Sequence, residues 1–280
     1  MTLTSEEQPP AYARERVGFF TDTSVCIGCK ACEVACKEWN HVPEDGLLFT
    51  GMSFDNTKSL GASTWRHVAF IEQAKPIHER PAGLAGDGVA DSGLRWLMSS
   101  DVCKHCTHAA CLDVCPTGSL FRTEYGTVVV QEDICNGCGY CVPACPYGVI
   151  DKREDDGRVW KCTLCYDRLR ADMTPACAQA CPTESIQFGP LQELRQRADQ
   201  RLATLHDAGI ADARLYGADP NDGVGGTGAF FLLLDEPEIY GLPPDPVVTT
   251  HDLMSMWQRV VIAAGGLVAA TVVSCFRRAR

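Results

Sequence analysis

Short apolar runs, rich in β-branched and aromatic side chains, predict β-strands along the first two thirds of the chain. These runs are VGFFTD at 17–22, HVAFIE at 67–72, RWLMSS at 95–100, TVVVQE at 127–132 and SIQFGP at 185–190. Residues 191–208 instead place apolar side chains at helical spacing and end before Gly209, a residue type that commonly follows helices. A further buried strand is expected from Ala229 to Leu234.

Polar and glycine-rich stretches separate these elements. Residues 44–63 are rich in Gly, Asn, Asp and Ser, and we interpret them as a surface connection. The stretch GVGGTG at 223–228 predicts a loop, and residues 235–246 predict a proline-rich linker. GVGGTG lacks the lysine and the following helix of a phosphate-binding loop, so nucleotide binding is not expected.

The last apolar stretch is longer than the others. Residues 260–276 hold no charged side chain, which is close to the shortest length that spans a bilayer as a helix. Trp257 and the long side chain of Arg259 extend the span at one edge. A buried core helix is the alternative, but the position after a proline-rich linker favours a transmembrane anchor. We interpret Cys275 as a small apolar residue at the membrane edge.

Composition adds one dominant feature, the cysteines. The net charge of −11 argues against a general nucleic-acid-binding surface. The chain of 280 residues contains 17 cysteines. All but Cys275 form four groups of four: Cys26, Cys29, Cys32 and Cys36; Cys103, Cys106, Cys111 and Cys115; Cys135, Cys138, Cys141 and Cys145; Cys162, Cys165, Cys177 and Cys181.

The spacing of these cysteines separates three possible uses. Disulfides are not expected, because cysteines so close in sequence bridge distant segments poorly and the N-terminal residues contain no apolar export signal. A zinc ribbon is compatible with the fourth group taken alone. CNGCGYCVPACP at 135–146 matches the ligand pattern of bacterial ferredoxins at every position, and the other groups are variants of it. The sequence therefore predicts 4Fe–4S clusters.

Residues beside the cysteines suit a tight loop around a cluster. Gly28, Gly137 and Gly139 allow backbone N–H groups to approach sulfur. A proline follows the last cysteine of three groups, whereas Lys37 takes that place in the first group. We interpret Lys37 as the point where the chain leaves for the long segment up to residue 102.

In two-cluster ferredoxins, the fourth cysteine of each run binds the cluster of the other run. The second and third groups begin at Cys103 and Cys135, close enough in sequence for such a pair. One cluster is therefore expected on Cys103, Cys106, Cys111 and Cys145, and another on Cys115, Cys135, Cys138 and Cys141. The first and fourth groups are then expected to pair with each other around this inner module.

The predicted fold class is α+β, with one bacterial-ferredoxin-like module nested in another and one C-terminal transmembrane helix. The expected domains are an N-terminal extension (1–16), the first half of the outer module with an inserted loop (17–102), the inner two-cluster module (103–150), the second half of the outer module (151–190), a helix, strand and linker (191–250) and the anchor (251–280).

These motifs together resemble a known family. The resemblance rests on the four cysteine groups, on WKCTLCYDR and PACAQACPT, and above all on LYGADPNDGVGGTG and LDEPEIYGLPPDP before an apolar helix. They closely resemble the iron–sulfur (beta) subunit of membrane-bound respiratory formate dehydrogenases, from about Gly18 to the last helix. The cysteine groups alone indicate only the wider family of molybdoenzyme electron-transfer subunits.

The resemblance implies a subunit that transfers electrons and has no active site. A catalytic alpha subunit with a molybdenum or tungsten pterin cofactor would oxidise formate, and a cytochrome b gamma subunit would carry the electrons to quinone. The cluster facing the catalytic subunit would be bound by Cys26, Cys29, Cys32 and Cys181. The next would be bound by Cys36, Cys162, Cys165 and Cys177. The cluster on Cys115, Cys135, Cys138 and Cys141 would lie nearest the membrane haem.

Charges around the last helix predict its orientation in the lipid bilayer. Arg277, Arg278 and Arg280 follow it, and Asp245 and Asp252 precede it. The positive-inside rule places the C-terminus of this single-pass protein in the cytoplasm and the cluster domain outside. Since an apolar export signal is missing from the N-terminal residues, we hypothesise export with a partner that carries a twin-arginine signal. Attachment facing the cytoplasm is the alternative.

Two other functions stay open. A hydrogenase or a nitrate, polysulfide or sulfoxide reductase would contain an equivalent subunit, and a zinc protein without redox function is the third possibility. His105 and His108 lie within the second group, but four cysteines already supply its ligands, so neither is expected to bind metal. Paired carboxylates and catalytic triads do not stand out, and a small-molecule substrate is not expected in this chain.

Overall fold

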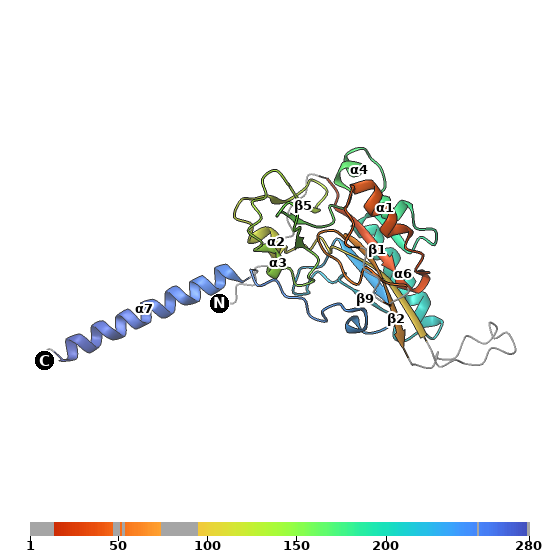
Figure 1. The fold of residues 1–280 in the computed structure, drawn as a ribbon. Coiled ribbons are helices and arrows are strands. Elements are labelled where there is room, and N and C mark those ends of the chain that lie inside the picture. Colours follow the sequence, from red (N-terminus) through yellow and green to blue (C-terminus); the bar gives the residue numbers. More distant parts are fainter. Residues whose placement is uncertain (1–13, 47–50, 52–53, 74–94, 251, 279–280) are drawn as a thin grey trace.

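A computed structural model describes residues 14–46, 51, 54–73, 95–250 and 252–278. The described part forms a body of short strands and helices, from which the last helix projects (Figure 1). The predicted N-terminal extension up to residue 13 and the terminal Arg280 lie outside the described residues.

The central sheet has four strands in the order β8, β1, β10, β9. They are β8 (Ile186–Pro190), β1 (Val17–Asp22), β10 (Ala229–Leu233) and β9 (Arg214–Tyr216). β1 pairs antiparallel with β8 and parallel with β10, where Phe19 lies opposite Ala229. Because β1 precedes the first cysteine group and β8 follows the fourth, this sheet joins the two ends of the cysteine-rich region.

Helix α6 (Leu191–Asp207) packs on this sheet through one apolar face. Its buried side chains contact Phe20 and Phe230 of the sheet. They recur at helical spacing, as the sequence predicts: Leu191, Leu194, Ala198 and Leu205. Burial of each leucine contributes about 1.5–3 kcal/mol. Gly209 follows the helix with φ +85°, which confirms the predicted helix end.

Three two-stranded antiparallel sheets accompany the central sheet within the described residues. They are β2 (Arg66–Gln73) with β3 (Arg95–Val102), β4 (Leu120–Arg122) with β5 (Val128–Val130), and β6 (Asp151–Lys152) with β7 (Val159–Trp160). The strands predicted at 17–22, 67–72, 95–100, 127–132 and 185–190 are all present, with ends that differ by up to two residues.

Short helices carry many of the cysteines. They are α1 (Ala31–Asn40), α2 (Ala110–Asp113), α3 (Cys141–Ala144), α4 (Tyr166–Arg170) and α5 (Ala176–Gln179), with 3₁₀ helices η1 (Thr23–Val25) and η2 (Pro237–Tyr240). α1, from the first group, packs on α5, from the fourth. α2, from the second group, packs on α3, from the third. The helix contacts thus follow the predicted nesting of one module inside the other.

The segment predicted as a proline-rich linker packs on the body of the molecule. Tyr240 and Leu242 are buried against Phe231 and Leu233 of β10. The N–H of Leu234 also donates to the Tyr240 hydroxyl at 3.1 Å. Residues 237–242 therefore extend the core on the side of the sheet that faces β3.

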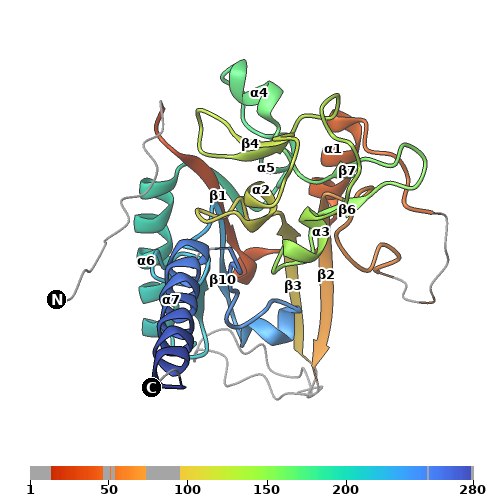
Figure 2. The same ribbon diagram turned by 90° about the vertical axis from the view of Figure 1, so that its left-hand side faces the viewer.

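Helix α7 (Leu253–Arg278) projects from the body, and Figure 2 shows it nearly end on. Within it, Ser255–Cys275 is a span of 21 residues with a mean hydropathy of 1.6, and none of it is buried. A helix of this length rises about 30 Å, which matches the hydrocarbon core of a bilayer. The predicted anchor is present as a helix long and apolar enough to cross a membrane, and it begins earlier than residue 260.

Candidate iron–sulfur centres

Cysteines from the two ends of the cysteine-rich region line one small cavity. They are Cys26, Cys29, Cys32 and Cys181. Val68, Ser100 and Ile186 form other parts of the wall. The 3₁₀ helix η1 leads to Cys26, while the packing of α1 on α5 brings the first group to the end of the fourth. This structure brings together the four residues that the family resemblance implies for one cluster.

The remaining cysteines of these two groups lie close to one another. Burial raises the pKa of Cys36 well above its ordinary value, and the thiols of Cys162, Cys177 and Cys165 raise it further. The side-chain amide of Asn40 lies 3.8 Å from Sγ of Cys36 and 3.7 Å from Sγ of Cys165. Cys36 thus lies close to the cysteines of the fourth group.

The inner cysteines form a second cavity and a neighbouring set. The cavity is lined by Cys103, Cys106, Cys111 and Cys145. Burial raises the pKa of Cys141 to about 12, and the nearby thiols of Cys115, Cys138 and Cys135 contribute. Cys145 thus lies with the cysteines of the second group, and Cys115 lies near those of the third. The exchange of fourth ligands between the two clusters stays a prediction.

Neighbouring sets also approach each other in a row. The thiol of Cys177 helps to raise the pKa of Cys32, that of Cys103 the pKa of Cys162, and that of Cys141 the pKa of Cys111. Each set of cysteines that lie together is therefore next to another set. The set that contains Cys26 adjoins the one with Cys36, which adjoins the one with Cys103, which adjoins the one with Cys115. The four sets form one continuous series through the body.

The donor chemistry suits 4Fe–4S clusters. Burial raises the pKa of Cys32 to about 11 and that of Cys111 to about 12, so these thiols need bound cations to become thiolates at neutral pH. Iron supplies that charge, and its binding would release protons. The N–H of Leu164 donates to Sγ of Cys162 at 3.3 Å, a type of hydrogen bond that stabilises cluster ligands.

Within the described residues, no three His, Cys, Asp or Glu side chains lie close enough to hold a single metal ion. In a cubic cluster each cysteine binds a different iron, so its four ligands stand further apart than four zinc ligands do.

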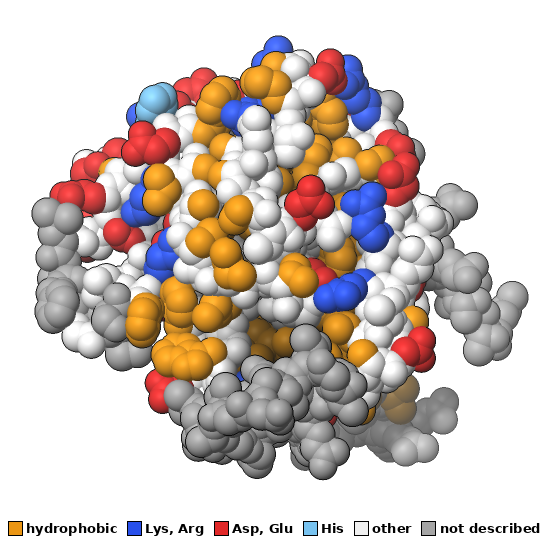
Figure 3. Space-filling model, turned by 90° about the vertical axis from the view of Figure 1, so that its right-hand side faces the viewer, with side chains coloured by type: hydrophobic (Ala, Val, Ile, Leu, Met, Phe, Trp, Pro, Cys, Tyr) orange, Lys and Arg blue, Asp and Glu red, His pale blue; other side chains and the backbone are white. Residues whose placement is uncertain are grey.

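One cysteine at each end of the series reaches the surface. Cys29, in the first set, and Cys138, in the last, are exposed. Apolar residues accompany both, since Ile27 is 58% exposed beside Cys29 and Tyr140 is 64% exposed beside Cys138. The face of the molecule on the right-hand side of Figure 1 exposes hydrophobic side chains among charged ones over much of its area (Figure 3). Apolar side chains beside an exposed ligand are suited to contact with a partner protein.

The two histidines of the second group have structural contacts. His105 is buried, and its Nδ1 accepts the N–H of Val128 at 3.1 Å. Burial holds its pKa well below the ordinary value, and the charges of Lys161 and Arg122 add to this effect. The backbone N–H of His108 donates to the carbonyl of Val224 at 2.8 Å. GVGGTG therefore packs against the second cysteine group.

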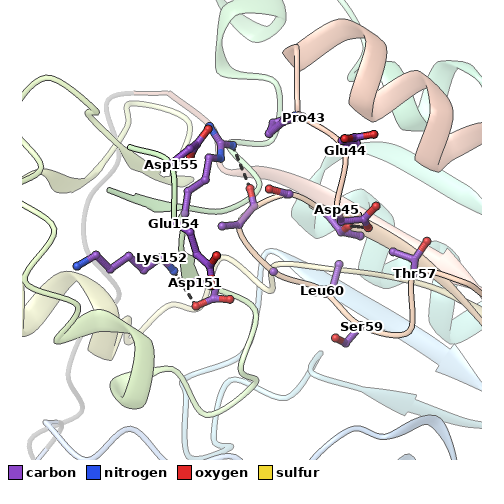
Figure 4. A pocket seen from close by; sticks show the side chains of 15 residues that line it. Pro43, Glu44, Asp45, Thr57, Ser59, Leu60, Asp151, Lys152, Glu154 and Asp155 are labelled. Atoms are coloured by element: carbon purple, nitrogen blue, oxygen red, sulfur yellow. Dashed lines mark hydrogen bonds between the residues drawn. The ribbon is translucent and has the colours of Figure 1, made fainter. Parts of the chain in front are cut away.

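An open polar cavity of about 470 Å³ lies apart from the cysteines. Figure 4 shows residues of segment 43–64 on one side and Asp151–Asp155 on the other. Arg153 donates to the carbonyl of Ala62 at 3.1 Å and links the two sides. Cysteines are missing among its lining residues, so this cavity is not a cluster site.

Three buried cations near the cysteines were not anticipated from the sequence. Arg66, Lys104 and Lys161 are each at most 2% exposed. Lys104 pairs with Asp101, whereas Lys161 donates to the carbonyls of Val128 and Cys162. The place of Lys161 directly before Cys162 could have indicated that it lies near a cluster. A weaker indication for Arg66 is its place at the start of an apolar strand.

Two family matches agree with these sites. Residues 94–191 match a family described as a 4Fe-4S dicluster domain, and residues 25–119 match a second family with the same description. Two dicluster domains account for four 4Fe–4S clusters.

Curated relatives cover almost the whole chain. It is 37% identical over 277 residues to the nitrate-inducible formate dehydrogenase iron-sulfur subunit of Escherichia coli, covering 96% of this chain and 87% of that protein. It is 38% identical over 284 residues to the formate dehydrogenase iron-sulfur subunit of Haemophilus influenzae, covering 97% and 85%. A component of the anaerobic dimethyl sulfoxide reductase of E. coli is 36% identical over 180 residues, or 64% of this chain and 76% of that protein.

The relatives and the cysteine geometry point to the same conclusion. The chain is an electron-transfer protein with four 4Fe–4S clusters and a helix suited to membrane anchoring. It belongs to the family of formate dehydrogenase iron–sulfur subunits.

Proposed function

We propose that this chain is the electron-transfer subunit of a membrane-bound formate dehydrogenase. When bound, its clusters accept and donate single electrons between a catalytic subunit that holds a molybdenum or tungsten pterin and a cytochrome b subunit that reduces quinone. The observation that carries the proposal is the continuous series of cysteine sets with one exposed ligand at each end, Cys29 and Cys138.

The proposal assigns four cysteines to each cluster. Cluster 1 is held by Cys26, Cys29, Cys32 and Cys181, cluster 2 by Cys36, Cys162, Cys165 and Cys177, cluster 3 by Cys103, Cys106, Cys111 and Cys145, and cluster 4 by Cys115, Cys135, Cys138 and Cys141. The shared cavities and the electrostatic contacts among these thiols support the assignment. The six domains predicted from the sequence follow the same nesting and remain a prediction.

Each end of the series is assigned to one partner subunit. The surface around Ile27 and Cys29 faces the catalytic subunit, and the surface around Cys138 and Tyr140 faces the cytochrome b subunit. Exposed apolar side chains at both places support these contacts. Helix α7 crosses the membrane once, with Arg277 and Arg278 on the cytoplasmic side and the body on the outer side. Export with a signal-bearing partner accounts for this sidedness.

A related complex is the second candidate. The sulfoxide reductase relative matches 64% of the chain, whereas the nitrate-inducible subunit of E. coli and the H. influenzae subunit match 96% and 97%. The longer matches take in regions outside the four cysteine groups, and this difference favours formate dehydrogenase.

Purification of the complex through a tag on this chain tests the function. We expect a pterin-containing subunit and a cytochrome b subunit to co-purify, and formate to reduce the clusters in the EPR spectrum. A complex reduced by hydrogen but not by formate would contradict the proposal.

The ligand pairing needs a separate test. Cys181→Ser should damage cluster 1, although the other three ligands of that cluster come from the first group. The matched control Cys275→Ser should leave the EPR signals of all four clusters intact. An unchanged signal from cluster 1 in Cys181→Ser would contradict the pairing without contradicting the use of formate.

A further inference from the structure

Arg66 is a fully buried guanidinium among the cysteines of clusters 1 and 2. It is 1% exposed and begins β2. Its Nη1 donates to the backbone carbonyl of Ser100 at 3.2 Å and to the Ser100 hydroxyl at 3.1 Å. The guanidinium also lies 4.8 Å from the centre of the Phe19 ring. These contacts fix the position of its positive charge.

The charge of Arg66 has no carboxylate counterpart among the ion pairs of the described residues. Its Nε and Nη2 are buried, and neither has a hydrogen-bond partner in the described part of the chain. A buried charge without compensation costs a large fraction of the total stability of a protein. A neighbouring negative group is therefore needed to explain why this arginine lies in the core.

The groups that can supply negative charge are cysteines of both outer clusters. Burial lowers the pKa of Arg66, but Cys177, Cys32, Cys162 and Cys36 together raise it above the ordinary value. Cys32 belongs to the proposed cluster 1 and the other three to cluster 2. The Ser100 hydroxyl that accepts from Arg66 also lies 3.2 Å from Sγ of Cys32. Arg66 thus lies where the two ligand sets approach each other.

We propose that Arg66 is the shared counter-cation of clusters 1 and 2 and keeps the reduction potentials of both higher than a neutral residue would. The inference rests on the ligand assignment of the proposed function. Reduction adds negative charge to a thiolate-bound cluster, and a nearby cation in a low-dielectric interior stabilises that charge. Since arginine keeps its proton at all physiological pH values, the stabilisation does not vary with pH.

The other two cations that are at most 2% exposed, Lys104 and Lys161, act elsewhere. Lys104 already has Asp101 as its partner, and Lys161 acts on Cys111 of cluster 3. Arg66 acts on Cys32 and Cys36, one from each outer cluster, and its charge lowers the pKa of both against the larger effect of burial. An effect on two clusters together is therefore a specific expectation for Arg66.

An EPR-monitored redox titration of the purified complex tests the proposal. In Arg66→Gln and Arg66→Met, we expect the potentials of clusters 1 and 2 to shift to lower values while those of clusters 3 and 4 stay unchanged. Arg66→Lys keeps the charge and should titrate close to the wild type. Arg153→Gln is the matched control, because Arg153 also stacks on an aromatic ring, that of Trp160 at 4.1 Å, and donates to a backbone carbonyl.

The outcomes are distinct. Wild-type potentials in a neutral variant that retains four clusters would overturn the proposal, and so would an equal shift of all four. The methionine variant keeps the test possible if the buried glutamine does not fold, since apolar residues of similar volume commonly replace buried charges without loss of the fold. Formate reduction of the wild-type clusters is measured separately, so a failure of the proposed function would be recognised independently of Arg66.

Discussion

Trp39 donates its indole N–H to the carboxylate of Asp167 at 2.7 Å. Trp39 lies in α1, after Cys36, and Asp167 lies in α4, after Cys165. The same indole ring is stacked on the guanidinium of Arg168 at 4.1 Å. This contact joins two helices that are distant in sequence and adjoins two proposed ligands of cluster 2.

Trp39→Phe should therefore weaken the retention of cluster 2. Loss of one hydrogen bond costs about 0.5–1.5 kcal/mol, which corresponds to a cluster loss that is roughly 2- to 10-fold faster. The measurement is the decay of the cluster 2 EPR signal in the presence of an iron chelator. Trp96→Phe is the control, because its exposed fraction is almost the same, 41% against 40%. Equal decay in both variants would contradict the prediction.

Gly137 and Gly139 offer a matched pair in the loop of cluster 4. Both have positive φ, +70° and +77°. A Cβ atom on Gly137 would lie 2.1 Å from the carbonyl oxygen of Gly157, whereas one on Gly139 would meet no heavy atom within 4 Å. We expect Gly137→Ala to lose cluster 4, because the backbone around Gly157 must move to make room for the methyl group. Gly139→Ala should keep the cluster and lose only about 1–2 kcal/mol of folding stability, the cost of a left-handed conformation for alanine. Iron and sulfide content with EPR distinguishes the two, and retention of cluster 4 in Gly137→Ala would refute the argument.

Asp22 fixes the turn that leads from β1 to Cys26. Its carboxylate accepts the N–H of Ser24 at 2.9 Å and Nε of Arg201 at 2.9 Å, and its side chain is 4% exposed. Asp22→Ala leaves both donors without this acceptor, at a cost of about 1.5–3 kcal/mol per bond to a charged group.

The midpoint of thermal unfolding should consequently fall by about 6–12 °C in Asp22→Ala, at roughly 2 °C per kcal/mol for a chain of this size, as followed by circular dichroism at a fixed scan rate. Asp207→Ala, at an exposed position, serves as the control and should unfold near the wild-type temperature. A midpoint in Asp22→Ala within a degree of that control would show that the turn contributes little.

Leu267 lies near the middle of the apolar span of α7 and is 71% exposed. An aspartate at the centre of a membrane helix is about 2.5–3.5 kcal/mol unfavourable. With the chain expressed by itself, Leu267→Asp should move from the membrane fraction to the soluble fraction after an alkaline carbonate wash. Leu267→Ile should stay with the membrane. Equal retention of both variants would argue against a spanning helix.

Much of this molecule could be predicted from short-range patterns. β1 and β8 are recognisable because β-branched and aromatic residues gather in them, and α6 because its leucines recur at helical spacing. The cysteine groups are local signals too, since three ligands of each proposed cluster come from a single group.

Long-range contacts were harder to predict. The parallel pairing of β1 with β10 joins segments at the two ends of the body, and β6 with Asp151 and Lys152 has no apolar alternation. The burial of Arg66 depends on Phe19, Ser100 and cysteines of the first and fourth groups. The residues next to Arg66 in the sequence do not predict its burial, because an arginine at the start of a strand is commonly exposed.

The position of β10 in the sheet has a consequence for synthesis of the protein. β1 leaves the ribosome before any cluster ligand, but its parallel neighbour β10 leaves only after all sixteen. The sheet can therefore be completed only after every proposed ligand has been synthesised, so closure of the core follows the emergence of all sixteen cysteines.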